Sequence, residues 1–451
     1  MIPVLTPAEM AAVDAAAPEA VEVLIQRAGA AVAHHALDLL GGGYGMRVVV
    51  LAGKGNNGAD GRSAAARLRR RGVRVQVIDA LAAPTRLPEA DLVIDAAVGT
   101  GFKGEYHAPD VGGAAVLAVD IPSGVDGMTG EERGKALFAA RTVTFAALKP
   151  GLLLEPGRRL GGDVVVADIG LAVGSPAVGL VERGDVAGWL PPRGRDSHKW
   201  HAAVLIVAGS PGMTGAAHLA AAAAQRAGAG MVRVGSPGLD DDRSRPTEAV
   251  GLELAQGGWA DPVLAVLDRF HALVVGPGLG TQEATQTAVR EVLRRARVPA
   301  VVDSDALTAL GTDAADVLAG RSAGTVLTPH DGEHERLTGT PPGPDRIGAA
   351  RALASRTSSV VLLKGPSTVV AGPDGRVRVV TAGDARLATA GTGDVLSGTI
   401  GALLSRGLDP LEAAAAGAWL HARAGALGLA VGLVAGDLVE LLPLALAEVS
   451  T

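Results

Sequence analysis

The chain has 451 residues, a formal net charge of −6 and no cysteine. Its length predicts about two to four domains and allows more than one hydrophobic core. The lack of cysteine excludes disulfide bonds, thiolate catalysis and cysteine-ligated zinc. The charge balance argues against nucleic acid or a membrane surface as a partner.

No targeting or membrane-spanning segment is predicted. Residues 1–6 lack the basic and apolar regions of a signal peptide. The apolar stretch at residues 424–436 is bounded by Arg423 and Asp437 and is too short to span a bilayer. We therefore expect a cytoplasmic protein.

Short Val-rich runs recur through the first part of the chain, with helical segments between them. They lie at residues 47–52, 73–78, 91–95, 116–120 and 142–145. Strands that alternate with helices predict an α/β fold with a Rossmann-like, doubly wound parallel sheet. Ligands of such sheets bind beyond the carboxyl ends of the strands, so the polar residues after each strand are the candidates for a site.

The loop after the first predicted strand, residues 53–61, contains a G-x-G-x-x-G match. Together with Asp79 at the end of the next strand, it allows a dinucleotide-binding interpretation. Asn56, Asn57 and Asp60 are unusual in a loop that only cradles pyrophosphate, because their oxygens suit a cation or a hydroxyl-rich ligand. A turn rich in Asn and Gly, without a ligand, is the structural alternative.

Two further loops follow strands at the same predicted edge, at residues 95–104 and 120–126. A single acid at a strand end, such as Asp95 or Asp120, is more often a helix cap or turn residue. Three such loops at one edge favour a site.

These loops resemble a known family, the NAD(P)H-hydrate epimerases, over about residues 1–185. The motifs are Asn-Asn-Gly-x-Asp-Gly, Asp-x-x-x-Gly-Thr-Gly, Val-Asp-Ile-Pro-Ser-Gly and residues 145–151. The resemblance implies that Asp120 does acid/base work at the hydrated nicotinamide carbon. It also implies a potassium ion held by Asn57, Asp95 and Ser123. The implied substrate contacts are Asn56, Asn57, Gly58, Ala59, Asp60, Gly99, Thr100, Gly101, Phe102, Lys103, Gly104, Glu105 and Asp120.

Ala59 departs from the family, which mostly has Gly there. If that position needs a positive φ or a close backbone approach, Ala would strain the loop.

Residues 189–200 contain two prolines and a run of polar and charged residues, which is typical of a linker. We therefore expect one domain at residues 1–188 and a second at 189–451.

Apolar runs recur in the second part, at residues 203–210, 231–234, 272–275, 300–302, 325–327 and 360–363. They predict a second α/β domain. Chemically capable residues again follow the strands, at residues 276–280, 303–305, 328–330 and 364–368. Taken singly, Lys364 could be a surface residue and His330 could simply close a turn.

A Gly-Thr-Gly turn at residues 391–393 is followed at once by Asp394 and an apolar run that predicts a helix. Free backbone N–H groups at the start of this helix would point at an anion, and Asp394 would stand where a general base is needed. A Gly-rich loop capped by an acid is the alternative. With Lys364, the motif supplies the cation, donors and base that phosphoryl transfer needs, although no G-x-x-x-x-G-K-[ST] loop is present.

The second part resembles the ADP- or ATP-dependent NAD(P)H-hydrate dehydratases of the ribokinase-like superfamily, over about residues 195–445. Matching segments include residues 198–199, 228–230, 327–333 and 420–421. The resemblance implies substrate contacts from Ala216, Gly280, His330 and Asp394, and ADP or ATP as the phosphoryl donor, with Mg²⁺. The implied nucleotide contacts are Lys364, Gly365, Pro366, Ser367, Thr368, Thr389, Gly391, Thr392 and Gly393.

Two departures from the dehydratase pattern stand out. Ser304 replaces the usual Ala, and residues 384–386 replace an Asn-containing stretch. The second departure puts the adenine or ribose side of the nucleotide site in question.

Both resemblances together imply a bifunctional repair enzyme for hydrated NADH and NADPH. The first domain would interconvert the R and S epimers, and the second would dehydrate the S form. We also expect a homo-oligomer. The alternative is a ribokinase-like small-molecule kinase with a regulatory nucleotide-binding domain.

Overall fold

The computed structural model describes residues 1–192, 194–239 and 245–450. Arg193, in the expected linker, lies outside the described residues. The chain forms two compact units, Ile2–Val178 and Gly179–Thr451 with Met1. Within the described ranges, no helix is both long and apolar enough to cross a membrane.

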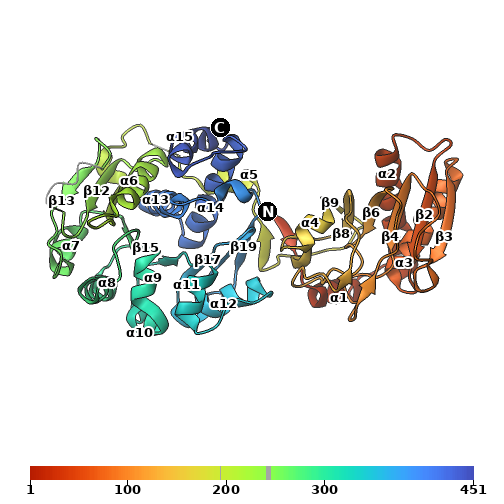
Figure 1. Cartoon of the computed structure of the whole chain (residues 1–451), viewed down its shortest axis with the longest axis horizontal. Helices are drawn as coiled ribbons and strands as arrows, with labels where there is room; N and C mark the ends of the chain where they lie inside the picture. Colours follow the sequence, from red (N-terminus) through yellow and green to blue (C-terminus); the bar gives the residue numbers. More distant parts are fainter. Residues whose placement is uncertain (193, 240–244, 451) are drawn as a thin grey trace. The chain divides into compact units, whose positions relative to one another are not determined.

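The first unit is built on a parallel sheet in the order β3-β2-β4-β6-β8-β9 (Figure 1). Strand β2, next to the edge strand β3, pairs in parallel with both β3 and β4, with Val50 opposite Val77 and Ile94. The strands are β2 (Arg47–Ala52), β3 (Arg74–Asp79), β4 (Leu92–Ala96), β6 (Ala115–Val119), β8 (Arg141–Phe145) and β9 (Asp163–Ala167). The expected strands are thus confirmed, and β9 was not predicted.

The two faces of this sheet are covered differently. Helices α2 (Val21–Leu40) and α3 (Asn56–Arg70) bury one face, where Val32 and Leu68 join the core. Irregular segments bury the other face, with Leu87 and Leu137 packed beneath it. The remaining elements are β1 (Ile2–Val4), α1 (Pro7–Ala15), η1 (Ala80–Ala82), β5 (Tyr106–His107), β7 (Gly134–Lys135), η2 (Pro150–Leu152) and α4 (Gly157–Gly161).

The second unit has a larger sheet in the order β10-β19-β18-β17-β16-β15-β14-β11-β12-β13. From β17 to β13 its strands run parallel, whereas β18 is antiparallel to both β17 and β19. Its strands are β10 (Val178–Leu180), β11 (Ala203–Val207), β12 (Met231–Gly235), β13 (Val250–Leu252), β14 (Ala272–Val275), β15 (Ala300–Val302), β16 (Thr325–Leu327), β17 (Val360–Leu363), β18 (Thr368–Ala371) and β19 (Val377–Val380).

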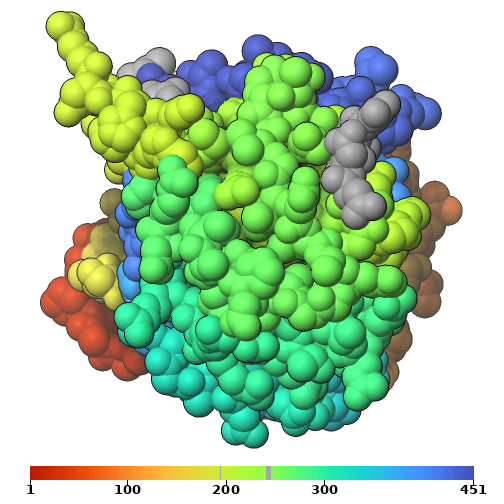
Figure 2. Space-filling view, turned by 90° about the vertical axis from the view of Figure 1, so that its left-hand side faces the viewer, coloured from red at the N-terminus to blue at the C-terminus, as the bar shows by residue number. Residues whose placement is uncertain are grey.

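Helices lie on both sides of this sheet. Figure 1 shows α6, α13, α14 and α15 on one side and α8 to α12 on the other. At the β13 edge, α7 and α8 form part of the green surface that faces the viewer in Figure 2. The helical elements are α5 (Arg183–Trp189), η3 (Lys199–Ala202), α6 (Thr214–Arg226), α7 (Ala260–Leu267), α8 (Glu283–Arg295), α9 (Asp305–Leu310), η4 (Gly311–Asp313), α10 (Ala314–Leu318), α11 (Asp331–Thr338), α12 (Arg346–Thr357), η5 (Ala385–Leu387), α13 (Thr392–Ser405), α14 (Pro410–Leu427) and α15 (Ala435–Ala447).

Helix α13 is held close to helix α6 and to the sheet by small residues. A Cβ atom at Gly398 would lie 2.0 Å from the Ala220 carbonyl oxygen, and one at Gly401 would lie 2.4 Å from Val274 Cγ2. Because any larger side chain would push α13 outward, these glycines fix the position of its first turn, which contains Asp394.

The boundary between the two compact units falls between residues 178 and 179, before the expected linker. The segment between these positions and the linker belongs to the second unit because Val181 and Val186 are buried in its core. The expected division of the two functions at residues 188 and 189 stays a prediction.

Candidate active sites

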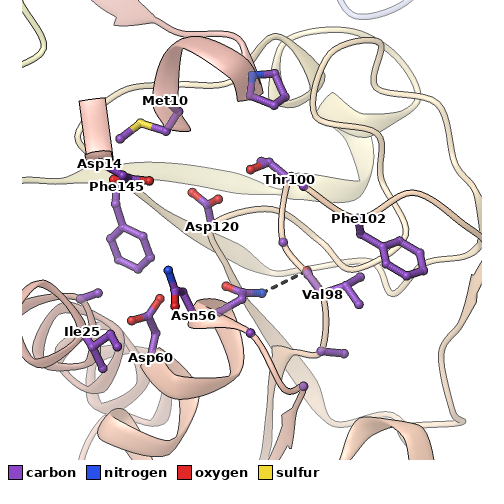
Figure 3. Close-up of a pocket in the computed structure, with 18 of the residues that line it drawn as sticks. Met10, Asp14, Ile25, Asn56, Asp60, Val98, Thr100, Phe102, Asp120 and Phe145 are labelled. Atoms are coloured by element: carbon purple, nitrogen blue, oxygen red, sulfur yellow. Dashed lines mark hydrogen bonds between the residues drawn. The ribbon is translucent and has the colours of Figure 1, made fainter. Parts of the chain in front are cut away.

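The first unit contains a pocket of about 660 Å³ at the carboxyl ends of its parallel strands. Figure 3 shows residues from several loops and helices converging on it, among them Asn56, Asp60 and Asp120. Met10 and Asp14, from α1, form another part of its wall. The pocket therefore lies where a parallel sheet places its ligands.

Asp120 is held in this pocket by a buried lysine. The Nζ of Lys149 lies 2.5 Å from Asp120 Oδ1, and the Lys149 side chain is only 1% exposed. Nζ also donates to Thr144 Oγ1 at 2.8 Å and to the Phe145 carbonyl oxygen at 3.1 Å. Asp120 has a positive φ of 66°, which is unfavourable for a residue with a Cβ and is typical of functional positions.

Two more acids line the pocket beside Asp120. Burial raises the pKa of Asp60 to about 8, and the charges of Asp120 and Asp14 add to the effect. Burial also raises the pKa of Asp14. Asp60 is therefore mostly protonated at neutral pH and can donate a proton.

Asn57, Asp95 and Ser123 meet around the backbone of Val98. Asn57 Nδ2 donates to the Val98 carbonyl oxygen at 3.0 Å, and the Val98 N–H donates to Ser123 Oγ at 3.0 Å. The Ser123 N–H donates to Asp95 Oδ2 at 2.8 Å. Asn57 Oδ1 is buried and has no hydrogen-bond partner among the described residues, and burial raises the pKa of Asp95.

This cluster offers oxygen atoms of the kind that bind a hard cation. A bound cation would satisfy Asn57 Oδ1 and offset the cost of burying the Asp95 carboxylate. No group of three or more His, Cys, Asp or Glu residues suited to a metal occurs in the described part of the chain. The residues present therefore fit an ion held by amide, hydroxyl and carboxylate oxygens.

Most of the residues expected in the first site line this pocket. They are Asn56, Asn57, Asp60, Gly99, Thr100, Gly101, Phe102, Glu105 and Asp120. Gly58, Ala59, Lys103 and Gly104 are not among the lining residues. Gly58 has a packing role instead, because a Cβ there would lie 2.0 Å from the Gly53 carbonyl oxygen. Ala59 lies inside α3, so the positive φ considered for it is not required and the expected strain is absent.

Several pocket residues were missed from the sequence. Lys149 belongs to a motif that was noticed but received no role, and its position four residues after the end of β8 was the available signal. Met10, Asp14 and Tyr106 carried no such signal, because they come from α1 and from a short edge strand.

The second unit gathers charged residues at the ends of its central strands. Lys364, after β17, lies 3.0 Å from Asp303 Oδ1 and 3.4 Å from Glu333 Oε2. Burial opposes the charge of Lys364, but these two carboxylates raise its pKa. Its side chain is 22% exposed, so Lys364 belongs to a largely buried cluster and is not an ordinary surface residue.

Asp394 lies in the first turn of α13, beside this cluster. Burial raises the pKa of Asp394 to about 7, Asp303 and Asp305 add to the rise, and Lys364 opposes it. Gly391, with a φ of 88°, is the N-cap residue of α13, and no side chain of the described residues caps this helix. Its first N–H groups are therefore available to an anion. A Cβ at Gly393 would lie 3.8 Å from Lys364 Nζ, so the turn and the lysine are neighbours.

The other expected substrate residues lie on neighbouring segments of the same sheet edge. Ala216 is in the first turn of α6, and the Gly280 N–H donates to Asp305 Oδ2 at 2.8 Å. His330 caps α11, since its Nδ1 accepts from the Gly332 N–H at 3.0 Å. The turn-closing alternative is thus part of its role. The ring is about half exposed, and its Nε2 lies 3.6 Å from Glu333 Oε1. Ser304 has a φ of 54°, a conformation for which an L-residue pays strain.

The expected nucleotide residues flank the cluster. Lys364 to Ser367 form the turn from β17 into β18, which begins at Thr368, and Thr389 and Gly391 lead into Thr392 and Gly393 of α13. Asp384 and Arg386 form an ion pair at 2.6 Å, and Arg386 also donates to the Gly428 carbonyl oxygen. The departure at residues 384–386 therefore forms a self-contained turn tied to the end of α14.

Comparisons with known proteins identify relatives of both units. A family model described as NAD(P)H-hydrate dehydratase matches residues 204–442, and one described as YjeF-related protein N-terminus matches residues 21–86 and 78–151. The crystal structure of ADP/ATP-dependent NAD(P)H-hydrate dehydratase from Bacillus subtilis, co-crystallised with ATP and Mg²⁺, has a TM-score of 0.53 and 31% identity. The alignment covers 59% of this chain and 97% of that one.

Relatives that match most of the chain are named as bifunctional enzymes. The bifunctional NAD(P)H-hydrate repair enzyme of Mycobacterium tuberculosis is 44% identical over 403 residues, which cover 83% of this chain and 82% of the relative. Its counterpart in Moorella thermoacetica is 39% identical, over 88% of this chain and 87% of the relative. The chain therefore belongs to the family of bifunctional NAD(P)H-hydrate repair enzymes.

Proposed function

We propose that the first unit interconverts the R and S epimers of hydrated NADH and NADPH in the pocket around Asp120. The second unit removes water from the S epimer at the cluster around Asp394, with ADP or ATP as the phosphoryl donor. The observation that carries this assignment is that one chain, matched over most of its length by bifunctional relatives, contains both sites. The product of one site is the substrate of the other.

The epimerisation needs acid and base groups at one carbon. The hydrated carbon bears a hydroxyl and is bonded to the ring nitrogen. If the hydroxyl leaves as water, the nitrogen lone pair stabilises a planar iminium carbon, and water that adds to the other face inverts the centre. The leaving hydroxyl needs a proton, which Asp60 can supply because its pKa is about 8. The adding water must lose a proton, which Asp120 beside Lys149 can accept.

Potassium is proposed for the first unit. Asn57, Asp95 and Ser123 would hold it, with Asn57 Oδ1 supplying a buried oxygen that accepts no hydrogen bond from the part of the chain that the structure describes. The ion would supply a fixed positive charge beside the loop that lines the pocket.

In the second unit, the dehydration begins with phosphoryl transfer. Asp394 accepts the proton of the substrate hydroxyl as its oxygen attacks the terminal phosphorus of the nucleotide. The N–H groups at the start of α13 and the ammonium of Lys364 stabilise the charge on the transferring group. The C–O bond then breaks and inorganic phosphate leaves with its electron pair. The neighbouring ring carbon loses a proton to the departing phosphate, and the double bond of NADH or NADPH is restored. Mg²⁺ would accompany the nucleotide and neutralise charge on its phosphates.

A direct assay tests this function. Purified protein is mixed with the R and S epimers of hydrated NADPH, K⁺, Mg²⁺ and either ADP or ATP, and nicotinamide absorbance is followed. We expect complete recovery of absorbance from both epimers, and the comparison of donors shows which nucleotide is preferred. Nucleotide consumption that requires an alcohol acceptor other than the hydrate would instead support the kinase alternative. The cytoplasmic location and the homo-oligomer stay predictions.

A further inference from the structure

We propose that Asp303 is a positioning residue for the dehydration, because its buried carboxylate holds Lys364 and the helix of Asp394 in one fixed arrangement. This inference rests on the function proposed for the second unit. Asp303 was noticed in the sequence only as one polar residue of a strand-end loop. No role in substrate or nucleotide binding was expected for it.

Both carboxylate oxygens of Asp303 are engaged. Oδ1 accepts from Thr328 Oγ1 at 2.7 Å and from Lys364 Nζ at 3.0 Å. Oδ2 accepts from Ser397 Oγ at 2.7 Å. Asp303 itself is 2% exposed. A fully buried carboxylate with three donors is strongly fixed in orientation, because any rotation would leave a buried polar group unpaired.

These contacts join four elements of the site. Asp303 follows β15, Thr328 follows β16, Lys364 follows β17, and Ser397 is in α13, three residues after Asp394. Residues three apart on a helix lie on the same face, so the bond to Ser397 anchors the turn of α13 that carries Asp394. Asp303 thereby sets the spacing between the ammonium that contacts phosphate and the carboxylate that accepts the proton.

Asp303 also acts on Asp394 through its charge. The charged groups that influence the pKa of Asp394 are Asp303 after β15, Asp305 of α9 and Lys364 after β17. Two further titratable groups, Glu333 of α11 and His421 of α14, interact with Lys364. Of the charged groups that raise the pKa of Asp394, Asp303 has the largest effect. Its negative charge therefore keeps Asp394 a stronger base than burial alone would make it.

The test compares three variants of the full-length protein in dehydration of the S epimer between pH 5 and 9. Asp303→Asn removes the charge and keeps the side-chain size. We expect kcat at pH 8 to fall at least about tenfold with a smaller change in KM, and the acidic limb of the kcat profile to move to lower pH by about half a unit or more. Asp313→Asn, at an exposed acid of the same unit paired with Arg290, is the matched control and should behave as wild type.

A merely structural loss would lower kcat without moving the acidic limb, and that result overturns the proposal. If Asp303→Asn does not fold, as judged by its thermal unfolding, Ser397→Ala decides the question. That variant frees α13 from Oδ2 and keeps the charge of Asp303, so it should lower kcat at least about threefold with a smaller change in KM and an unchanged thermal unfolding temperature. An unchanged kcat, or a fall in kcat that only accompanies a lower unfolding temperature, overturns the proposal. Failure of the wild type to dehydrate the S epimer would instead refute the proposed function itself.

Discussion

Replacement of Asp60 by Asn should stabilise the first unit, and increasingly so at high pH. The Asp60 pKa is raised from 3.8 to about 8 in the folded protein, mainly by burial. Between these values the folded state binds one more proton than the unfolded state, so this residue lowers the free energy of unfolding as pH rises. Each pH unit corresponds to about 1.4 kcal/mol, which gives an upper bound of about 6 kcal/mol above pH 8. Relaxation around the ionised group reduces this value, and we expect about 2 kcal/mol or more.

This effect is measured by urea unfolding of wild type and Asp60→Asn at pH 5, 7 and 9, in buffers that contain no potassium. The stability difference in favour of the variant should grow by about 2 kcal/mol or more from pH 5 to pH 9. Glu22→Gln, at an exposed position of α2, provides the control and should show no such trend. A difference that stays constant with pH would refute the argument that Asp60 is buried as a protonated acid.

Three further predictions concern the reactions. Lys149→Met should slow epimerisation at least about tenfold by removing the ammonium beside Asp120, with dehydration of pure S epimer unchanged as the internal control. Replacing K⁺ by a bulky organic cation should slow epimerisation of wild type, whereas Asn57→Ala should be slow in both salts; equal rates of wild type in both salts would count against the ion. For wild type, the kcat of dehydration should fall about tenfold per pH unit below about 7, where Asp394 becomes protonated, while an acidic limb near pH 4 would contradict the assignment of Asp394 as the base.

Much of both sheets could be predicted because their strands are buried on both faces. Residues 48–52 form a continuously apolar run between helices α2 and α3, and residues 360–363 form another after helix α12, which is the pattern of a parallel strand. The β18 and β19 hairpin was missed although both strands are largely apolar and their connection, residues 372–376, contains the turn sequence Pro373-Asp374-Gly375. β13 and β9 lie at or near sheet edges, where the sequence constraint is weaker.

The loops of the sites could be located from the sequence, but not the pairings inside them. Residues 56–60, expected in a loop, form the start of α3, and three of them line the same pocket as Asp120, since both segments follow parallel strands of one sheet. The ion pair of Asp120 with Lys149 depends on a positive φ at Asp120 and on a lysine 29 residues away, and no local pattern encodes either. The contacts of Asp303 with Lys364 and Ser397 likewise span 61 and 94 residues.

The central claim is that one chain carries two separate active sites, and a pair of variants tests it most directly. Asp394→Asn and Asp120→Asn are each assayed for two reactions, interconversion of the R and S epimers and nucleotide-dependent recovery of NADPH from pure S epimer. We predict that Asp394→Asn abolishes dehydration and keeps epimerisation, and that Asp120→Asn does the reverse. Equal loss of both activities in either variant would contradict the claim.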